Sequence, residues 1–438
     1  MPTHDRRIVD DELDDLNGQL PAIALEGPKA VGKTATAQQR AKSVYRMDDP
    51  AARAVLQAGP AVWEGAARPI LVDEWQRMPD IWDRVRRTVD DNPHIPDQFL
   101  LTRSALPPHA GAQDPHTGAG RIISIRMRPL SLAERSIASP TVSLGALLAG
   151  GPRPLSGETT LTVQDYTRQI LASGFPGIRR LSDRAQRAQV DAYIARVVDR
   201  DFREAGHVVR RPAVVRRWMA AYAAATATVT SYQKNRAAAG SGEGDDHDAA
   251  HLAARGTAHG YGEVLERLWL LEPLEGWSPA WNTLKRVAQA PRHHLADPAL
   301  AARLLGVTAG RLLAGERTPL VASAATPRDG TLLGQLFESL VSQSVRLYSQ
   351  RHEAQVRHFR VWDGRREVDL IVERGDARVL AIEVKLSASI DDDDLWYLLW
   401  LKAEMKDDLL DMVLVNTGPY AYRHASGVAS VPASLLGP

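Results

Sequence analysis

The chain has 438 residues, which is enough for two or three domains that each bury a core. It has no cysteine, which excludes a disulfide framework, a cysteine-based zinc site and a thiol nucleophile. The 54 lysines and arginines balance 53 acidic residues, and the net charge of +1 neither requires nor excludes a nucleic-acid partner. No apolar run reaches the roughly 18–20 residues that span a bilayer, and Met1 to Asp15 lacks the apolar core of a secretory signal. We therefore expect a cytoplasmic protein without membrane contact.

The first chemical signal is a P-loop motif, Gly-Pro-Lys-Ala-Val-Gly-Lys-Thr at 27–34, between an apolar strand at 22–25 and a helix-forming segment at 35–42. Its glycines let backbone N–H groups face a polyphosphate, and the helix start adds positive charge. Lys33 would contact the β- and γ-phosphates, and Thr34 would ligate Mg²⁺. A plain glycine turn would leave Lys33 and Thr34 unexplained. The predicted ATP-binding residues of this segment are Gly27, Pro28, Lys29, Ala30, Val31, Gly32, Lys33, Thr34 and Ala35.

A second segment, Pro69 to Glu74, is an apolar run that ends in two carboxylates and is typical of a Walker-B strand. A buried parallel strand would deliver Asp73 to Mg²⁺, and Glu74 could polarise the attacking water. The alternative is a buried strand with an acidic edge and no catalytic role. The P-loop favours the catalytic interpretation.

A third apolar strand is predicted at 98–102 and ends in polar residues. Thr102 or Ser104 would fit the polar sensor that AAA-type ATPases place near the γ-phosphate. A hydroxyl that caps the next turn is the alternative. We expect Thr102 to take part in nucleotide binding.

The middle of the chain, roughly 160–310, is mostly helical by pattern, with apolar residues at helical spacing over 185–202. Short helices among arginines predict a helix-turn-helix or winged-helix module that binds DNA. A helical lid with a solvated basic face is the alternative. The arginines are Arg184, Arg187, Arg196, Arg200, Arg203, Arg210, Arg211, Arg216 and Arg217.

The C-terminal part carries the second chemical signal, a hairpin of strands at 366–373 and 378–386. Alternation places Val368 on one face with Leu370 and Val372, and it turns Asp369 the other way. Pairing the strands would bring Asp369 close to Glu383 and Lys385. A surface hairpin with a Glu–Lys pair worth ~0.2–1 kcal/mol is the alternative.

An Asp followed by Glu-x-Lys on the next strand resembles the PD-(D/E)xK pattern of restriction-endonuclease-like folds, although Val368 stands where the usual proline would be. The resemblance implies that Asp369 and Glu383 hold Mg²⁺ and that Lys385 orients or activates water. Glu338, in the segment Leu336 to Val341, matches the extra acid often found on the first helix of that fold.

The chain as a whole resembles bacterial and archaeal AAA-type ATPases with a C-terminal domain of unknown function. Besides the P-loop and Walker-B segments, the matching positions are Gly120-Arg121, Arg128 to Glu134, Ser173 to Pro176 and Arg200-Asp201. The resemblance makes Arg121 the candidate for an arginine finger supplied in trans, and an ordinary surface arginine is the alternative. Arg103 stands where the family has glycine, which adds a cation close to the expected phosphates.

These observations predict an α/β protein in three parts. They are an AAA-type P-loop ATPase domain at 1–137, a linker with a helical or winged-helix-like middle at 138–310, and an α/β restriction-endonuclease-like domain at 311–438. The linker is the stretch 138–158, which is rich in Gly, Pro and Ser. The predicted cofactors are ATP and Mg²⁺, with Thr34, Asp73, Glu338, Asp369 and Glu383 as metal ligands and Lys33 and Glu74 as catalytic residues. We expect a homo-oligomer in which ATP hydrolysis controls a nuclease acting on DNA. The alternative is an ATP-switched DNA- or protein-binding regulator without nuclease activity.

Overall fold

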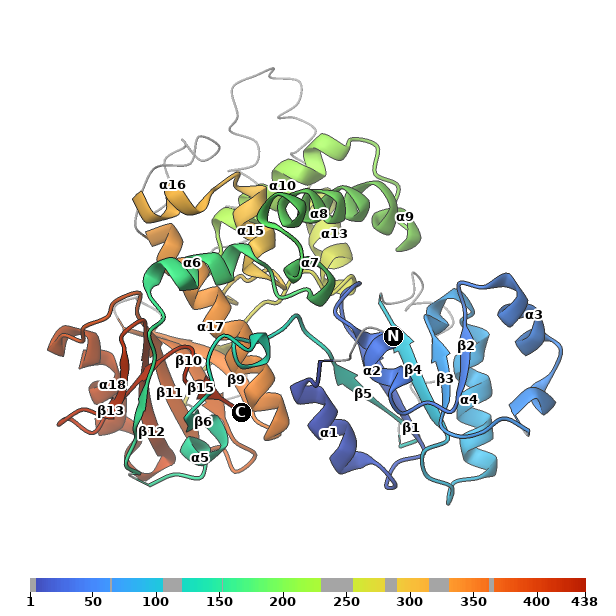
Figure 1. Ribbon diagram of the computed structural model, residues 1–438, viewed down its shortest axis with the longest axis horizontal. Coiled ribbons are helices and arrows are strands. Elements are labelled where there is room, and N and C mark those ends of the chain that lie inside the picture. The colour runs from blue at the N-terminus through green and yellow to red at the C-terminus, as the bar shows by residue number, and fades with distance from the viewer. Residues whose placement is uncertain are drawn as a thin grey trace. The chain divides into compact units, whose positions relative to one another are not determined.

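The computed structural model describes residues 5–63, 65–104, 120–151, 153–229, 255–279, 290–314, 331–361 and 366–438. The chain divides into two compact units, drawn in Figure 1. Unit 1 consists of Met1–Arg128 with two later segments, Asp199–Val208 and Val264–Leu270. Unit 2 consists of Pro129–Val198, Val209–Glu263 and Leu271–Pro438. Two short segments from the middle of the sequence therefore belong to the same unit as the P-loop.

Unit 1 is built on a five-stranded sheet in the order β2-β3-β4-β1-β5, in which every neighbouring pair is parallel. Because the strands are parallel, their carboxyl ends meet at one edge of the sheet, where ligands bind in open α/β folds. The P-loop, Asp73 and Thr102 follow or end β1, β3 and β4 and so share this edge, called here the P-loop edge. The strands are β1 (Ala22–Glu26), β2 (Ser43–Arg46), β3 (Ile70–Asp73), β4 (Phe99–Arg103) and β5 (Ile122–Arg126).

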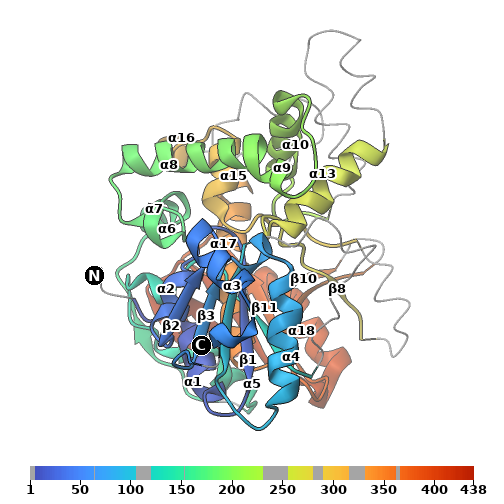
Figure 2. The same cartoon turned by 90° about the vertical axis from the view of Figure 1, so that its right-hand side faces the viewer.

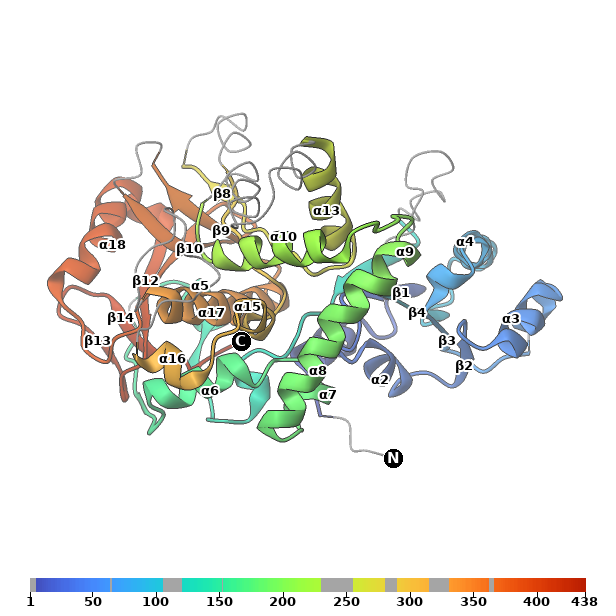
Figure 3. The same cartoon turned by 90° about the horizontal axis from the view of Figure 1, so that it is seen from above.

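Helices cover both faces of this sheet, with α2 on one side and α3 and α4 on the other (Figures 1 and 3). Alternation along the strands explains the two layers: Ala24, Val72 and Phe99 pack in one core cluster with Trp82 and Val85 of α4. Helix α2 ends before the predicted limit at 42, because the chain turns there to enter β2. The helical elements are α1 (Ile8–Leu16), α2 (Lys33–Gln38), α3 (Pro50–Gln57), α4 (Asp80–Asp91) and the 3₁₀ turns η1 (Pro60–Trp63) and η2 (Trp75–Arg77).

Unit 2 contains a mixed eight-stranded sheet in the order β7-β13-β14-β12-β11-β10-β9-β8. The predicted hairpin is confirmed, since β10 and β11 pair antiparallel with Leu370 opposite Ile382. A separate parallel pair joins β6 (Val142–Ser143) to β15 (Leu436–Gly437). The strands of the large sheet are β7 (Gly157–Glu158), β8 (Gly276–Trp277), β9 (Gln355–Arg360), β10 (Glu367–Glu373), β11 (Val379–Val384), β12 (Leu409–Asn416), β13 (Tyr420–Arg423) and β14 (Ala429–Pro432).

One detail of the hairpin differs from the prediction. The register between β9 and β10 shifts between Val368 and Ile371, and these two residues share a core cluster with α18. Alternation alone predicted Val368 on the face of Leu370 and Val372, and this was wrong because a β-bulge interrupts the period of two.

Helices α17 (Thr331–Arg351) and α18 (Asp392–Met405) pack on the sheet of unit 2, and α18 supplies Leu395, Leu398 and Leu401 to its core. Of the remaining helices of this unit, α5 packs against β11 and β12 of the sheet, and Figure 2 shows α8, α10 and α15 packed beside one another. The remaining helices are α5 (Leu144–Leu148), α6 (Val163–Leu171), α7 (Pro176–Arg179), α8 (Asp183–Arg196), α10 (Pro212–Ala224), α15 (Pro298–Leu304) and α16 (Ala309–Ala314), with 3₁₀ turns η3 (Ala133–Arg135) and η6 (Lys406–Asp408).

Two segments of the middle region depart from their predicted structure. The helix predicted over 185–202 is interrupted, because α8 is followed by a π-helical turn, η4 (Val197–Asp201), and then by α9 (Phe202–Glu204). The stretch 138–158, predicted as a linker, contains β6, α5 and β7. Ser143 caps α5 by accepting the Ala146 N–H, and β7 pairs with β13. Helix α13 (Arg255–Arg267) begins in unit 2 and ends in unit 1.

Candidate functional site

The P-loop adopts a conformation that requires its two motif glycines. Gly27 has φ +150, and a Cβ at this position would lie 2.0 Å from the carbonyl oxygen of Met127. Gly32 has φ +103 and is the N-cap of α2. The backbone conformation at both positions therefore disfavours any residue larger than glycine. At Gly27 the backbone of Met127 also leaves no room for a side chain.

Lys33 lies inside the loop, with its side chain almost fully buried. Its Nζ donates to the carbonyl oxygens of Gly27 at 3.0 Å and Pro28 at 2.8 Å. Burial lowers the pKa of Lys33 to about 8, although the carboxylates of Glu74 and Asp73 act in the opposite direction. Lys33 is therefore a cation that is held close to the point where it would lose its proton.

Asp73 joins the P-loop to two neighbouring strands. Its Oδ1 accepts hydrogen bonds from Thr34 Oγ1 at 2.6 Å and from Thr102 Oγ1 at 2.5 Å. Hydroxyl and carboxylate oxygens are the ligands that Mg²⁺ prefers, so Thr34 and Asp73 fit the metal that the P-loop motif implies. Thr102 also accepts the Glu74 N–H at 3.0 Å and so fixes the end of β3.

Glu74 follows directly and has a left-handed backbone, φ 57, which is uncommon for a residue with a side chain. Ser104 Oγ donates to its Oε1, and Gln76 Nε2 donates to its Oε2 at 2.7 Å. Both carboxylate oxygens are therefore held. The structure thus places Thr102 against Asp73 and Ser104 against Glu74.

Arg103, the residue that departs from the family pattern, pairs with an acid on the P-loop strand. Its Nη2 lies 2.6 Å from Glu26 Oε1, and its guanidinium lies over the Trp75 ring at 5.4 Å. Glu26 also accepts from Ser124 Oγ at 2.6 Å. Arg103 is therefore a paired cation at the P-loop edge.

The P-loop makes a contact with a distant part of the chain that sequence reasoning missed. Lys29, within the P-loop, has its Nζ 2.7 Å from Asp201 Oδ1 and 2.8 Å from Glu204 Oε2. The pKa of Glu204 is lowered to about 2, because the hydrogen bonds from Lys29 and Arg200 outweigh burial. The Arg200-Asp201 match was the available signal, but a separation of 172 residues hid its partner.

Arg121 lies away from the P-loop edge. It directly precedes β5, and the amino ends of parallel strands lie opposite the edge where the P-loop follows β1. Its Nε is 2.5 Å from Asp90 Oδ1, and 48% of its side chain is exposed. It has no place beside the P-loop of its own unit.

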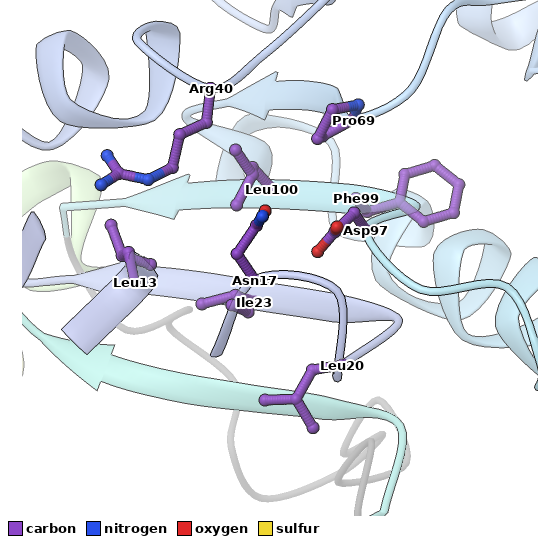
Figure 4. Close-up of a pocket in the computed structure, with 9 residues that line it drawn as sticks. All are labelled: Leu13, Asn17, Leu20, Ile23, Arg40, Pro69, Asp97, Phe99 and Leu100. Atoms are coloured by element: carbon purple, nitrogen blue, oxygen red, sulfur yellow. The ribbon is translucent and has the colours of Figure 1, made fainter. Parts of the chain in front are cut away.

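A small pocket of about 20 Å³ also lies at the amino ends of the strands, where Figure 4 shows its lining. The strand positions among its residues, Ile23 and Phe99, are near the starts of β1 and β4. The pocket is therefore distinct from the P-loop edge. Its lining consists of Leu13, Asn17, Leu20, Ile23, Arg40, Pro69, Asp97, Phe99 and Leu100.

Two further motifs of the resemblance hold unit 2 together. Ser173 Oγ and the Gly174 N–H both donate to the buried carboxylate of Asp297, which also caps α15. In the second motif, Arg128 to Glu134, the Leu132 N–H donates to Ser344 Oγ of α17 at 3.0 Å. Both motifs therefore have structural contacts in this chain.

The hairpin of unit 2 brings the predicted C-terminal residues together. Asp369 Oδ2 accepts the Val384 N–H at 2.9 Å, beside Glu383 in the chain. Lys385 Nζ lies 3.1 Å from Glu383 Oε1 and 3.9 Å from Asp394 Oδ1 of α18. Burial first, and then the nearby charge of Asp369, raises the pKa of Glu383 well above its ordinary value.

Glu338 of α17 joins this group through an arginine that sequence reasoning missed. Arg292 Nη1 donates to Glu338 Oε1 and, at 2.8 Å, to Asp369 Oδ1. Its Nη2 lies 3.6 Å from Glu367 Oε2. Burial raises the pKa of Glu338 to about 8, although Arg292 acts in the opposite direction. We call Glu338, Glu367, Asp369 and Glu383 the acidic cluster.

The fold and the P-loop edge define a P-loop ATPase-type domain at the N-terminus. Comparison with family models agrees, since residues 19–136 match an AAA domain, and this match suggests an ATPase. Residues 163–311 match a domain of unknown function (DUF8612), and residues 333–436 match another (DUF4143). No curated protein matches the chain.

Among the helices of the described residues, none is both long and apolar enough to cross a membrane. Within those same ranges, no three His, Cys, Asp or Glu side chains form a group that could hold a metal ion.

Proposed function

We propose that this chain binds MgATP at the P-loop edge of unit 1 and hydrolyses it. The observation that carries the proposal is the 2.6 Å contact between Thr34 and Asp73, which joins the P-loop to the Walker-B strand. The backbone of residues 27–35 would cradle the phosphates, and Lys33 would neutralise their charge. Thr34 and Asp73 would hold Mg²⁺, which when bound offsets the negative charge that develops on the phosphates.

Glu74 is the residue proposed to orient the attacking water and accept its proton. Ser104 and Gln76 support this role, because they restrain the two oxygens of its carboxylate. Thr102 supports it indirectly, since its hydroxyl contacts both Asp73 and the backbone of Glu74. Polar groups at the ends of two neighbouring strands, β3 and β4, thus lie together at one edge, where they could stabilise charge that develops during hydrolysis.

Replacing Lys33 tests the ATPase directly. We expect Lys33→Ala to lower steady-state phosphate release by about 100-fold or more, since one electrostatic contact to the transition state is worth that much. Lys42→Ala is the matched control, because Lys42 follows the same helix and is exposed. Turnover in Lys33→Ala equal to that of the control would overturn the P-loop assignment.

The proposal includes an oligomer in which Arg121 of one subunit acts on the nucleotide of the next. Its support is indirect: Arg121 is half exposed and lies at the opposite end of the strands from its own P-loop. An arginine in that position could complete a phosphate site only in trans.

For unit 2 we propose a restriction-endonuclease-like fold at the C-terminus, controlled by ATP and acting on DNA or a protein. The support is the hairpin that places Asp369 beside Glu383 and Lys385, together with Glu338 on α17. Seven of the predicted arginines are exposed in unit 2 and could contact a nucleic-acid backbone (Arg184, Arg187, Arg196, Arg210, Arg211, Arg216 and Arg217).

Between nuclease and non-cleaving regulator, the geometry favours the regulator. The observation is the contact of Arg292 with both Glu338 and Asp369, since these acids would otherwise be free to share a metal. On this proposal, ATP hydrolysis changes how the protein packs or binds, and the C-terminal domain docks its partner without cutting it.

A cleavage assay distinguishes the two functions. Plasmid and single-stranded DNA are incubated with Mg²⁺ or Mn²⁺, with and without ATP, beside Asp369→Ala and Lys33→Ala. We expect no cleavage in any arm while the unsubstituted chain still hydrolyses ATP. Cleavage that disappears in Asp369→Ala would establish the nuclease instead, and its loss in Lys33→Ala as well would show that ATP gates it.

A further inference from the structure

The acidic cluster has the residue types of a divalent-metal site, but its geometry does not fit a metal shared by Glu338 and Asp369. One atom, Arg292 Nη1, donates to both acids and lies 2.8 Å from Asp369 Oδ1. A Mg²⁺ ion bound by the same pair would need to lie about 2.1 Å from an oxygen of each. The guanidinium therefore occupies the space between the two carboxylates that the ion would need.

We propose that Arg292 is the resident cation of the acidic cluster and that unit 2 takes no divalent metal there. The inference rests on the proposed non-cleaving role of unit 2 and supplies its physical cause. It does not depend on the ATPase of unit 1.

The backbone at Arg292 is fixed, so the side chain starts from a defined position next to the cluster. Arg292 and Leu274 exchange both backbone hydrogen bonds, at 2.8 and 2.9 Å. On the next residue, His293 donates its N–H to Thr228 and accepts from the Ala227 N–H. The segment is thus fixed on two sides, and only 3% of the Arg292 side chain is exposed. Moving the guanidinium away from the cluster would break its own hydrogen bonds to Glu338 and Asp369 and would require another position for its charge.

The charge balance of the cluster favours an internal cation over an added one. The Arg292 guanidinium pairs with Glu338 and Asp369. This pairing avoids the free-energy cost of removing water from Mg²⁺. An ion that entered would meet the buried positive charge of Arg292, and repulsion between like charges is strong away from water. Arginine also stays charged at every physiological pH, so a change of pH does not remove it.

The other cation of the pattern is also engaged. Lys385 lies against Glu383 and near Asp394 of α18, and 35% of its side chain is exposed. Each acid that the pattern assigns to a metal therefore has a cationic partner from the chain itself: Arg292 for Glu338 and Asp369, and Lys385 for Glu383. The arrangement is an ion-pair network built from the residue types of the nuclease pattern.

Mn²⁺ binding tests this inference, followed by electron paramagnetic resonance on nucleotide-free full-length protein. Every protein in the series carries Asp73→Asn, which removes the predicted metal ligand of unit 1. We expect no saturable binding in this parent up to millimolar Mn²⁺. Adding Arg292→Met should create a site with at least tenfold higher affinity. Arg303→Met is the matched control, because Arg303 forms a more exposed pair with Asp191, and we expect it to bind like the parent.

Two results would overturn the inference. Saturable Mn²⁺ binding by the parent that disappears on adding Asp369→Asn would show that the metal and Arg292 coexist. A folded Arg292→Met protein without gained binding would show that Arg292 is not what excludes the metal. If Arg292→Met does not fold, the parent and its Asp369→Asn derivative decide the question alone. Phosphate release by the chain without Asp73→Asn is measured separately, so a failed ATPase is distinguishable from a failed metal inference.

Discussion

The P-loop edge of unit 1 and the acidic cluster of unit 2 both gather carboxylates on strands, but different groups face those carboxylates. Asp73 and Glu74 are met by the hydroxyls of Thr34, Thr102 and Ser104. Glu338 and Asp369 are met by a guanidinium. A hydroxyl can share a cation with the carboxylate beside it, whereas a guanidinium takes the place of the cation. The same acids can therefore form a metal site in one unit and a closed ion-pair network in the other.

The largest expected effect comes from removing the guanidinium. We expect Arg292→Met to lower the free energy of unfolding by about 3–5 kcal/mol, because it leaves two acids buried without their partner. Arg303→Met, at a more exposed pair, should cost about 1 kcal/mol or less. Urea unfolding followed by circular dichroism measures both. Equal losses in the two variants would mean that the acidic cluster does not depend on Arg292, and the contrast between the units would disappear.

A smaller effect is expected from a hydroxyl of the P-loop edge. Ser104→Ala removes one of the two groups that hold Glu74, and we expect kcat for ATP to fall about tenfold with little change in KM, since a hydrogen bond to a charged group is worth about 1.5 kcal/mol. Steady-state phosphate release measures both constants, with Ser43→Ala in β2 as the control. A fall in affinity with unchanged kcat would assign Ser104 to nucleotide binding rather than to Glu74.

The smallest effect concerns the pH dependence of the two cations. Burial lowers the pKa of Lys33 to about 8, whereas the pKa of Arg292 is raised, because Glu338 and Asp369 outweigh burial. Nucleotide binding should favour protonated Lys33, so ATP affinity should weaken as pH rises through 8. We expect Kd to increase about threefold between pH 7.5 and 8.5, with proton uptake visible in calorimetry. A constant Kd would mean that Lys33 keeps its charge across this range.

The main features of the P-loop edge could be predicted because its signals are local. The motif spacing located Lys33 and Thr34, and apolar runs located the strands that carry Asp73 and Thr102. The carboxyl ends of parallel strands lie at one edge of the sheet. The proximity of Lys33, Thr34, Asp73 and Thr102 could therefore be predicted without knowledge of any side-chain contact. The hairpin of unit 2 could also be predicted from the sequence, because a turn between two segments with a period of two indicates that these strands pair.

The remaining features depend on contacts between distant parts of the chain. Arg292 is 46 residues from Glu338 and 77 from Asp369, and nothing in its neighbourhood distinguishes it from other arginines. The bulge at Val368 has no marker residue, and it reversed the predicted face of that side chain. The stretch 138–158 was predicted as a linker because it is rich in Gly, Pro and Ser. Its strands are too short to show a period, and their pairing with β13 and β15 determines their structure.

The contact of Lys29 with Asp201 and Glu204 has a practical consequence for dividing this protein. A fragment ending at residue 137 would contain every nucleotide-binding motif, yet it would lack both acids that balance a lysine inside the phosphate loop. It would also lack Trp269, whose ring lies 3.7 Å from the Arg126 guanidinium. Such a fragment would lose these partners of two cations, Lys29 and Arg126. It would be expected to attract anions indiscriminately, so its affinity for ATP would be a poor guide to that of the whole protein.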